Sequence, residues 1–288
     1  MAPSKKVTVP YIVASKRKGR KLVMLTAYDA TFARLVDEAG VDMVLVGDSL
    51  GMVVQGCENT IRVTLDEMIY HCRAVSRGLT RAHLCGDMPF MSYKISPQQA
   101  LESAARLVQE GRCESVKLEG GIEVAETITR LVAAGIPVVG HVGLTPQSVH
   151  ALGGFRMQGR SGFDRERIIE DARAVADAGA FCLVLESMPL ELACSISEEV
   201  SIPTVGIGAG PCCDGQVLVV YDMLGMNEQF TPRFLKRYAE MGREVREAVS
   251  RYAGEVRSGE FPAAEHSTSV DERKGGGSIY GSAKTTKH

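Results

Sequence analysis

The sequence lacks any apolar run approaching the roughly 20 residues that a membrane-spanning helix needs. It also lacks a charge surplus, because 33 Lys and Arg stand against 35 Asp and Glu, for a formal net charge of −2. A chain with so little net charge has no general attraction to nucleic acid or to anionic lipid surfaces. We therefore expect neither a membrane protein nor a nucleic-acid-binding protein.

Targeting signals are missing as well. The first residues have neither the apolar core of a secretory signal nor the long amphipathic character of a transit peptide, so we expect a cytoplasmic protein. One basic cluster, Lys16-Arg17-Lys18 with Arg20 and Lys21, has no aromatic residues interleaved and leads into an apolar segment. Such a cluster is typical of a solvated entry loop.

Cysteines at metal or redox spacing are also absent. The sequence has no C-x-x-C pair and no Cys/His cluster at zinc spacing, and a chain of 288 residues is too large to need disulfides for stability. We expect reduced, mostly buried cysteines, with adjacent Cys212 and Cys213 as the one pair of interest. The eight are Cys57, Cys72, Cys85, Cys113, Cys182, Cys194, Cys212 and Cys213.

What the sequence does contain is a repeated alternation of strand and helix. Short apolar segments rich in β-branched residues recur eight times, mostly followed by a longer stretch with helical spacing. This alternation favours a closed parallel (β/α)8 barrel, the TIM barrel, over an open doubly wound sheet. The expected strands are 22–26, 43–47, 83–86, 115–118, 137–140, 181–185, 203–207 and 218–221.

The expected helices fill the gaps between these strands. Several end in an Ala-Gly pattern typical of a helix C-cap, as at Gly40, Gly135 and Gly179. We expect one barrel domain over residues 1–262 and a polar, disordered C-terminal tail over 263–288, which is rich in Gly, Ser, Lys and Thr. The expected helices are 30–39, 65–78, 97–110, 122–134, 164–178, 189–200 and 232–252.

Polar residues stand where several of these strands end. Parallel barrel strands are buried on both faces, and the active sites of such barrels lie at the carboxyl ends of the strands. We therefore expect these side chains to share one mouth. They are Asp48 and Ser49 after the second strand, Asp87 after the third, Lys117 and Glu119 at the fourth, His141 at the fifth, and Glu186 with Ser187 at the sixth.

Each of these residues has a structural alternative. A single Asp at a strand end commonly caps a helix, a lone His141 could be a hydrogen-bonded structural histidine, and Glu186 could precede a helix as its first acid. The occurrence of the whole series at successive strand ends favours a functional site. His71 and His83 fall outside the series, and we expect structural roles for both.

The carboxylates of this mouth suit a hard cation. Asp48 and Asp87 are the natural pair for Mg²⁺, which takes one or two protein carboxylates, with Glu119 as a third ligand or a holder of metal-bound water. Such an ion would bind a small oxo acid and stabilise the enolate left by proton removal. Glu186, expected among apolar neighbours that would raise its pKa, is the candidate base, and Lys117 would supply fixed positive charge.

Two loops complete the expected rim. The stretch "GIGAGPCCDG" departs from the G-x-G-x-x-G dinucleotide fingerprint and precedes a strand, so we expect a tight turn that lets backbone approach a ligand. The connection over residues 143–162 exceeds ordinary loop length and is expected to cover the site or to form subunit contacts.

Seven strings carry a resemblance to a known family: "MLTAYDA", "VLVGDSLGMVVQG", "GDMPFMSY", "SVKLEGG", "GIPVVGHVGLTPQS", "LVLESMP" and "IPTVGIGAGPCCDGQVLVVYDMLG". In this order, over about residues 8–260, they closely resemble ketopantoate hydroxymethyltransferase, also named 3-methyl-2-oxobutanoate hydroxymethyltransferase. The resemblance implies one-carbon transfer from 5,10-methylenetetrahydrofolate to 3-methyl-2-oxobutanoate (alpha-ketoisovalerate). The product would be 2-dehydropantoate, on the route to pantothenate and coenzyme A. A homo-oligomer, typically a decamer of two pentameric rings, is also implied.

By position, the resemblance implies a role for each residue at the expected mouth. Mg²⁺, one per subunit, would be held by Asp48 and Asp87 with Glu119 in association; Asp48, Ser49, Asp87 and Lys117 would bind substrate; Glu186, Lys117 and His141 would be catalytic. The chain departs from the family's common pattern at Cys57-Glu58 and at Met88, and neither departure involves a proposed metal ligand.

Two other functions compete with this one. The barrel also resembles the phosphoenolpyruvate mutase and isocitrate lyase group, which would make the chain a carbon–carbon lyase, but the Lys-Lys-Cys-Gly-His loop of that group is missing. A non-catalytic assembly or regulatory subunit would be expected to have lost a ligand or the base. Asp48, Asp87, Lys117, Glu119 and Glu186 are all present.

Overall fold

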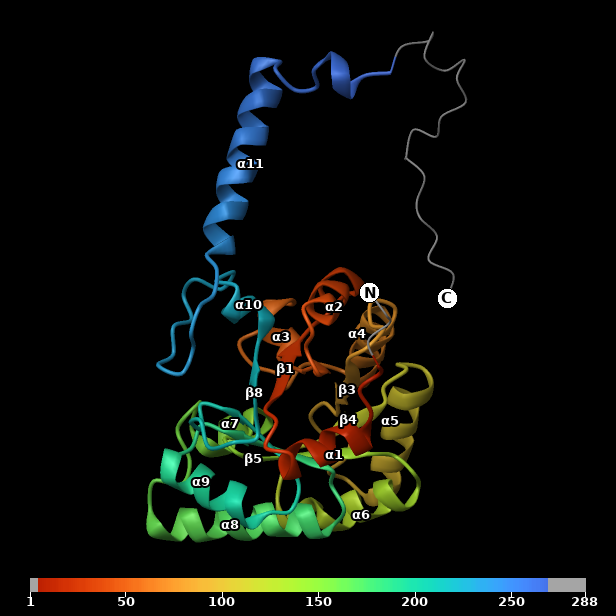
Figure 1. Cartoon of the computed structure of the whole chain (residues 1–288), viewed down its shortest axis with the longest axis vertical. Helices are drawn as coiled ribbons and strands as arrows, with labels where there is room; N and C mark the ends of the chain where they lie inside the picture. Colours follow the sequence, from red (N-terminus) through yellow and green to blue (C-terminus); the bar gives the residue numbers. More distant parts are fainter. Residues whose placement is uncertain (1–4, 269–288) are drawn as a thin grey trace. The chain divides into compact units, whose positions relative to one another are not determined.

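The computed structural model describes residues 5–268 and divides the chain into two compact units, Met1–Tyr238 and Ala239–His288 (Figure 1). The first unit is a closed barrel in which every strand pairs in parallel with its neighbours and β8 pairs with β1. The predicted (β/α)8 barrel is therefore confirmed. Its strands are β1 (Leu22–Thr26), β2 (Met43–Val46), β3 (His83–Asp87), β4 (Ser115–Lys117), β5 (Val138–Gly143), β6 (Cys182–Glu186), β7 (Thr204–Ile207) and β8 (Gly215–Leu218).

Helices of this unit lie around the outside of the strands (Figure 1). N-capping residues determine where several of these helices begin. The Asp29 and Ser96 side chains accept hydrogen bonds from the backbone N–H of the second or third helical residue, and Thr64 forms a capping box with Glu67. The helices are α1 (Val9–Arg17), α2 (Ala30–Glu38), α3 (Leu50–Val53), α4 (Leu65–Ser76), α5 (Pro97–Gln109), α6 (Ala125–Ala133), α7 (Val149–Leu152), α8 (Gly162–Asp177), α9 (Leu190–Glu199) and α10 (Val220–Met223), with short 3-10 turns η1 (Ile122–Val124) and η2 (Pro146–Ser148).

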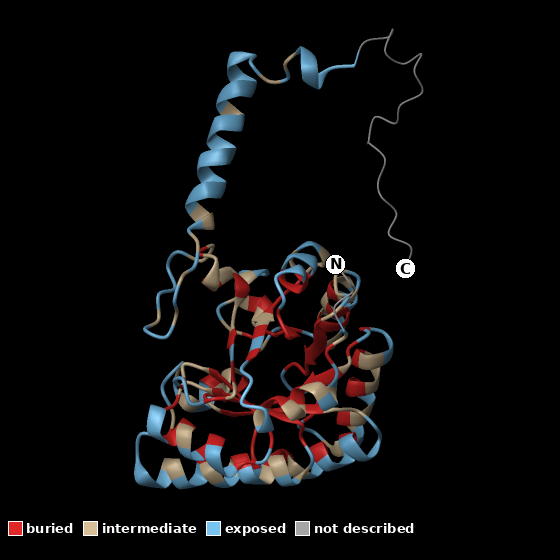
Figure 2. Ribbon diagram, in the orientation of Figure 1, coloured by how far each residue is buried: buried red, intermediate tan, exposed pale blue. Residues whose placement is uncertain are grey.

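The first unit has two hydrophobic cores, visible as buried strands and inner helix faces in Figure 2. The larger lies between strands and helices, and the smaller fills the barrel interior, where alternate strand residues such as Leu22 and Met24 meet Val7 and Ile12 from the start of the chain. Burying apolar area in both layers is the main source of barrel stability.

Helix α1 was not expected from the sequence. The sequence predicts a solvated loop for Lys16 and Arg17, and for Lys16 that prediction is wrong: its Nζ donates to Asp214 Oδ2 at 2.8 Å and to the Ser197 carbonyl at 2.6 Å. The apolar face that contains Ile12 drives this helix against the barrel interior, so Lys16 is placed beside an acid instead of in solvent.

The eighth strand begins three residues earlier than expected. Residues 218–221 were predicted to form it, but β8 spans Gly215–Leu218 and the apolar residues that follow begin α10. The start of β8 carries little strand signal, since Gln216 is exposed and Gly215 has no side chain. Glycine is required there because a Cβ would lie 2.6 Å from the Leu22 carbonyl oxygen.

The final helix also differs from the expected range 232–252. In the second unit, α11 spans Met241–Ser258, and a 3-10 turn, η3, spans Ala264–His266. The preceding segment is irregular because its polar groups are used otherwise: Tyr238 N–H donates to the Met223 carbonyl, and the Arg237 guanidinium donates to the Asn227 and Glu228 carbonyls. The predicted boundary at 262/263 stays a prediction, and the tail from residue 269 lies outside the described residues.

The cysteine prediction needs one correction. Cys194 of α9 and Cys212 of the β7–β8 loop form a disulfide, with their Cα atoms 5.0 Å apart, so Cys212 is not paired with its neighbour Cys213. The 18-residue separation of this pair gives no motif that sequence could reveal. The other six cysteines are free, and all but Cys57 are buried.

Over residues 5–268, no helix combines the length and apolar character that crossing a lipid bilayer requires.

Candidate active site

The barrel brings the predicted polar residues together at the carboxyl ends of its strands. Asp87, Lys117 and Glu186 are the last residues of β3, β4 and β6, and His141 lies within β5. Asp48 and Glu119 each follow a strand by two residues. Five of these residues are almost completely buried, each at most 4% exposed; they are Asp48, Asp87, Lys117, Glu119 and His141. Glu186 is the partly accessible member, with its side chain 21% exposed.

One half of the site is an aspartate pair neutralised by a lysine. Lys117 Nζ lies 2.5 Å from Asp87 Oδ1, and the backbone N–H of Asp48 donates to Asp87 Oδ2 at 3.2 Å. Ser49, beside Asp48, has its Oγ 2.9 Å from the Tyr28 hydroxyl. These contacts fix the two carboxylates next to one ammonium group in a buried place.

The other half is a row of three groups centred on a histidine. His141 Nδ1 lies 3.5 Å from Glu119 Oε1, and His141 Nε2 lies 3.2 Å from Glu186 Oε2. The ring is therefore sandwiched between one fully buried and one partly exposed carboxylate. Both nitrogens face acceptors, which favours the doubly protonated imidazolium.

The pKa directions follow from this packing of charges. Burial raises the pKa of the Asp48 carboxyl well above its usual range, and the charges of Asp87 and Glu119 add to the rise. Burial and Lys117 would lower the pKa of His141, but the carboxylates of Glu119 and Glu186 outweigh them and raise it to about 9. The aspartate half thus has more negative charge than Lys117 compensates.

Three further groups have shifted pKa values. In two of them the attraction between opposite charges outweighs the effect of burial, and in the third burial prevails. The pKa of Lys117 is raised although burial opposes this, because Asp87, Glu119 and Asp48 surround it. The pKa of Glu119 is lowered, since His141 and Lys117 outweigh burial. For Asp87, burial prevails over the neighbouring Lys117 and its pKa is raised.

Two residues of the site were missed from the sequence. Gln147, in η2, donates its side-chain N–H to Asp48 Oδ2 at 2.9 Å, and its backbone N–H donates to Glu119 Oε2 at 3.0 Å. The Tyr93 hydroxyl donates to Gln147 Oε1 at 2.7 Å and accepts from the Glu119 N–H at 3.1 Å. Neither residue stands at the end of a strand, so the search for polar residues at strand ends could not identify them. Their only signal in the sequence is that both lie within the strings that resemble the family.

The backbone around Glu186 is held tightly. Its carbonyl accepts from Leu144 N–H at 2.9 Å, and the next residue, Ser187, adopts a left-handed φ of +48° while its N–H donates to the Ile207 carbonyl. A left-handed non-glycine residue is costly and persists only where its surroundings impose it. Gly143 makes this possible, because a Cβ there would lie 2.3 Å from the Glu186 carbonyl oxygen.

The two histidines outside the series make structural contacts. His71 Nδ1 lies 2.7 Å from the Tyr28 carbonyl oxygen, and His83 Nε2 lies 2.9 Å from Ser115 Oγ.

The donor set fits one divalent cation held by two aspartates. Four carboxylates (Asp48, Asp87, Glu119 and Glu186) face two cations (Lys117 and His141), which leaves a deficit of positive charge. Both oxygens of Glu119 are already engaged, by His141 and by the Gln147 N–H. Within residues 5–268, no group of three His, Cys, Asp or Glu side chains is arranged to hold a metal ion, so an ion at this place would have at most two protein carboxylates as ligands. Mg²⁺ commonly uses only one or two protein carboxylates.

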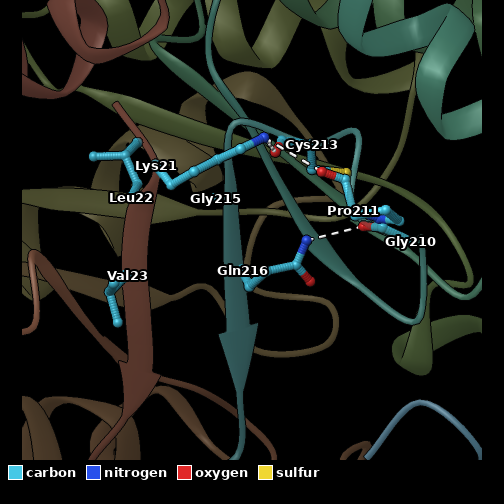
Figure 3. A pocket seen from close by; sticks show the side chains of 8 residues that line it. All are labelled: Lys21, Leu22, Val23, Gly210, Pro211, Cys213, Gly215 and Gln216. Carbon is cyan, nitrogen blue, oxygen red and sulfur yellow. Dashed lines mark hydrogen bonds between the residues drawn. The ribbon is translucent and has the colours of Figure 1, made fainter. Parts of the chain in front are cut away.

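A separate hollow of about 430 Å³ lies at the outer face of β1 and β8 (Figure 3). Figure 3 shows Lys21 and Gln216 reaching across it to the β7–β8 loop, where they donate to the carbonyls of Cys213 and Gly210. Its polar side chains are thus used to hold that loop, and its remaining lining is largely apolar. We assign this hollow a structural role.

Sequence comparison gives a consistent family for the whole barrel. The family described as ketopantoate hydroxymethyltransferase matches residues 6–264. A protein of Pelobacter propionicus named 3-methyl-2-oxobutanoate hydroxymethyltransferase is 56% identical over 91% of this chain and 97% of its own length. A protein of Oleidesulfovibrio alaskensis with the same name is 57% identical, covering 94% of this chain and 93% of its own.

Solved structures with similar folds are far more distant in sequence. Phosphonopyruvate hydrolase in complex with oxalate and Mg²⁺ aligns with a TM-score of 0.58 at 14% identity, over 92% of this chain and 93% of that one. 2,3-Dimethylmalate lyase, a member of the PEP mutase/isocitrate lyase superfamily, gives 0.57 at 15% identity, over 93% and 96%. At such identities the likeness supports the barrel fold alone.

Proposed function

Because this chain belongs to the ketopantoate hydroxymethyltransferase family and is an enzyme of the transferase class, we propose that it converts 3-methyl-2-oxobutanoate into 2-dehydropantoate. The one-carbon donor in this proposal is 5,10-methylenetetrahydrofolate, and the reaction is the first step toward pantothenate and coenzyme A, carried out in the cytoplasm. The observation that carries it is the row Glu119, His141 and Glu186 facing the buried aspartates at one barrel mouth.

Glu186 is the proposed base. It is the one carboxylate of the mouth whose side chain is partly accessible, so a substrate C–H can reach it, whereas Glu119 is buried beneath His141. The imidazolium of His141 keeps the carboxylate oriented, because its Nε2 lies within 3.2 Å of Oε2. A base within contact distance of the proton it removes is the first geometric requirement of this chemistry.

Lys117 and Ser49 are the proposed anchors for the oxo acid. Lys117 donates one N–H to Asp87, which leaves two ammonium protons for an incoming carboxylate or developing oxyanion. The Ser49 hydroxyl, held by Tyr28, adds a neutral donor on the same side. Together they would fix the oxo acid with C3 toward Glu186.

Asp48 and Asp87 would hold one Mg²⁺ per subunit, with Glu119, whose two engaged oxygens each keep a further lone pair, as the acceptor for a metal-bound water. When bound, the ion supplies positive charge to the carboxylate and keto oxygens of the oxo acid. The raised pKa of the Asp48 carboxyl supports this assignment, because burial and like charges there call for a cation.

The bonds of the reaction balance without any oxidant. Glu186 takes the proton from C3, and the resulting carbanion equivalent forms a C–C bond to the methylene carbon of the donor. Water supplies the hydroxyl group, the C–N bonds to the carrier break, and the protons released by Glu186 and water protonate tetrahydrofolate. His141 stays charged throughout: it stabilises the carboxylate form of Glu186, and its Nε2 stays beside Oε2 to orient the carboxyl group after protonation.

The test is formation of 2-dehydropantoate from purified protein, 3-methyl-2-oxobutanoate, Mg²⁺ and ¹³C-methylene-labelled donor, followed by mass spectrometry. We expect labelled product that depends on the donor and disappears with EDTA. Unlabelled substrate recovered intact in the complete mixture would refute the proposed function.

We also propose that the chain works as a homo-oligomer, a decamer, as its family resemblance implies. Sedimentation equilibrium at micromolar concentration should give about ten times the 31.0 kDa chain mass. A monomer under these conditions would contradict the proposal.

A further inference from the structure

The β5–α8 connection, which follows the carboxyl end of β5, forms a second hollow. It has a volume of about 630 Å³, within the range of small-ligand pockets, and is lined by Arg156, Met157, Gln158, Arg160, Asp164 and Arg167 among others. The same connection enters the catalytic site through Gln147, so one continuous segment touches both places.

The hollow is electropositive. Three arginines and one aspartate line it, a surplus of two positive charges. Asp164 Oδ2 accepts a hydrogen bond from the Ser161 hydroxyl at 2.7 Å, and Asp164 Oδ1 lies 3.9 Å from the Arg167 guanidinium. Arg156 and Arg160 make no ion pair with any carboxylate within residues 5–268, and both are exposed. Two unpaired guanidinium groups at one hollow are suited to carboxylates, which they can bind in a bidentate manner.

The hollow is also fixed relative to the proposed base. The backbone N–H of Gln158 donates to the Ser187 carbonyl at 2.9 Å, and Ser187 directly follows Glu186. Gly159 is buried against α9, where a Cβ would lie 2.4 Å from Leu192 Cδ2. A ligand that spans from the arginines to the mouth would therefore keep one end at a set position from Glu186.

We propose that this arginine hollow binds the glutamate tail of the folate donor while its methylene carbon lies at the mouth. The inference rests on the proposed function, which supplies the donor. A folate combines a reactive ring at one end with a chain of carboxylates at the other. The mouth itself is rich in carboxylates and would repel that chain, whereas the unpaired guanidinium groups of Arg156 and Arg160 would attract it.

Apolar side chains near the arginines suit the middle of the same molecule. Met157 lines the hollow and is 49% exposed, and Phe155 nearby in sequence is 50% exposed. A thioether and an aromatic ring are good contacts for a flat benzoyl group. One ligand with an aromatic middle and an anionic tail would thus contact both the arginines and the exposed Met157 and Phe155.

The test compares donors with one and three glutamates, using wild type, Arg156→Gln/Arg160→Gln and, as a control that removes an exposed arginine elsewhere, Arg130→Gln. For the double variant we expect KM for the triglutamyl donor to rise roughly tenfold, with kcat and KM for the oxo acid unchanged. KM for the monoglutamyl donor should rise less, and Arg130→Gln should behave as wild type. Thermal melting of each variant checks that it is folded.

The outcomes separate the two proposals. No transfer by wild type from either donor would refute the proposed function, and this inference with it. If wild type transfers the one-carbon unit but the double variant has the same KM for the triglutamyl donor as wild type, only the proposed role of the arginine hollow is refuted. Calorimetric titration with tetrahydrofolate triglutamate gives a second measure that is independent of turnover. Inorganic phosphate that competes as well as free γ-triglutamate would also overturn the assignment, because it would indicate a general anion site.

Discussion

His141 Nε2 lies 3.2 Å from Glu186 Oε2, and the opposite nitrogen of the same ring lies 3.5 Å from Glu119 Oε1. The histidine therefore connects a partly exposed carboxylate with a buried one. Because the ring is buried and its pKa is raised to about 9, it is a fixed positive charge at neutral pH. This arrangement gives the Glu186 carboxylate a defined orientation, while its side chain stays partly exposed.

The first prediction concerns this orientation. His141→Gln should lower the rate of proton removal at C3 by roughly 10- to 100-fold, because positioning and charge beside a base contribute about that much. Binding of the oxo acid, which we propose depends on the aspartate and lysine half, should change little. Steady-state kinetics give both values, and a variant with normal kcat would remove His141 from the mechanism.

The second prediction concerns the buried ion pair. Lys117→Met should destabilise the fold by roughly 3–5 kcal/mol, because it leaves Asp87 buried without its cation. The matched control is Lys6→Met, whose pair with Glu114 is more than a third exposed and should contribute at most about 1 kcal/mol. Urea unfolding of both variants measures the difference, and equal losses would mean that the interior pair is hydrated.

The third prediction uses two glycines of similar φ. Gly143 has φ +99° and a Cβ there would lie 2.3 Å from the Glu186 carbonyl oxygen, whereas Gly135 has φ +84° and open space around it. Gly135→Ala should cost only the roughly 1 kcal/mol of a left-handed alanine and leave activity intact. Gly143→Ala should cost more and should reduce kcat, because it displaces the base. Similar effects of the two changes on kcat would contradict the role of Gly143.

The fourth prediction concerns acid stability. Burial lowers the pKa of His83 from 6.5 to about 4, and its Nδ1 has no hydrogen-bond partner within the described residues. The folded protein therefore keeps this ring neutral while the unfolded chain takes up a proton below pH 6.5. Stability should fall with decreasing pH over that window, by roughly 2 kcal/mol near pH 5.

His83→Gln is the variant that checks this pH dependence, because glutamine can still reach Ser115 but does not titrate. Urea unfolding at about pH 7 and about pH 5 should show a smaller difference for the variant than for wild type. An identical difference would assign the acid sensitivity to other groups.

Most of the barrel could be predicted from periodicity. Seven strands begin within one residue of their expected starts, because their apolar runs coincide with the strand itself. The prediction of the eighth strand was wrong because β8 begins with Gly215 and Gln216, which are not apolar strand formers. The apolar run that follows forms a helix instead. Helix α1 was missed because its buried side is only a few residues, and charged residues dominate its end.

The site residues that stand at the carboxyl ends of strands could be predicted from the sequence. Asp48, Asp87, Lys117, Glu119, His141 and Glu186 meet as expected because the barrel imposes their convergence. Gln147 and Tyr93 escaped because they come from loops, whose paths depend on tertiary contacts. The expected apolar environment of Glu186 is also wrong, because its side chain is 21% exposed and its carboxylate pairs with His141. The roles of all these residues stay predictions.

We propose above that Glu186 removes the C3 proton of 3-methyl-2-oxobutanoate at this mouth. This step is tested most directly by NMR observation of proton-to-deuterium exchange at C3 in D₂O, with Mg²⁺ and tetrahydrofolate but without the one-carbon donor. We expect exchange by wild type that is abolished by EDTA, and no exchange by Glu186→Gln although that variant still binds the oxo acid. Exchange by Glu186→Gln at the wild-type rate would contradict the account and assign the base elsewhere.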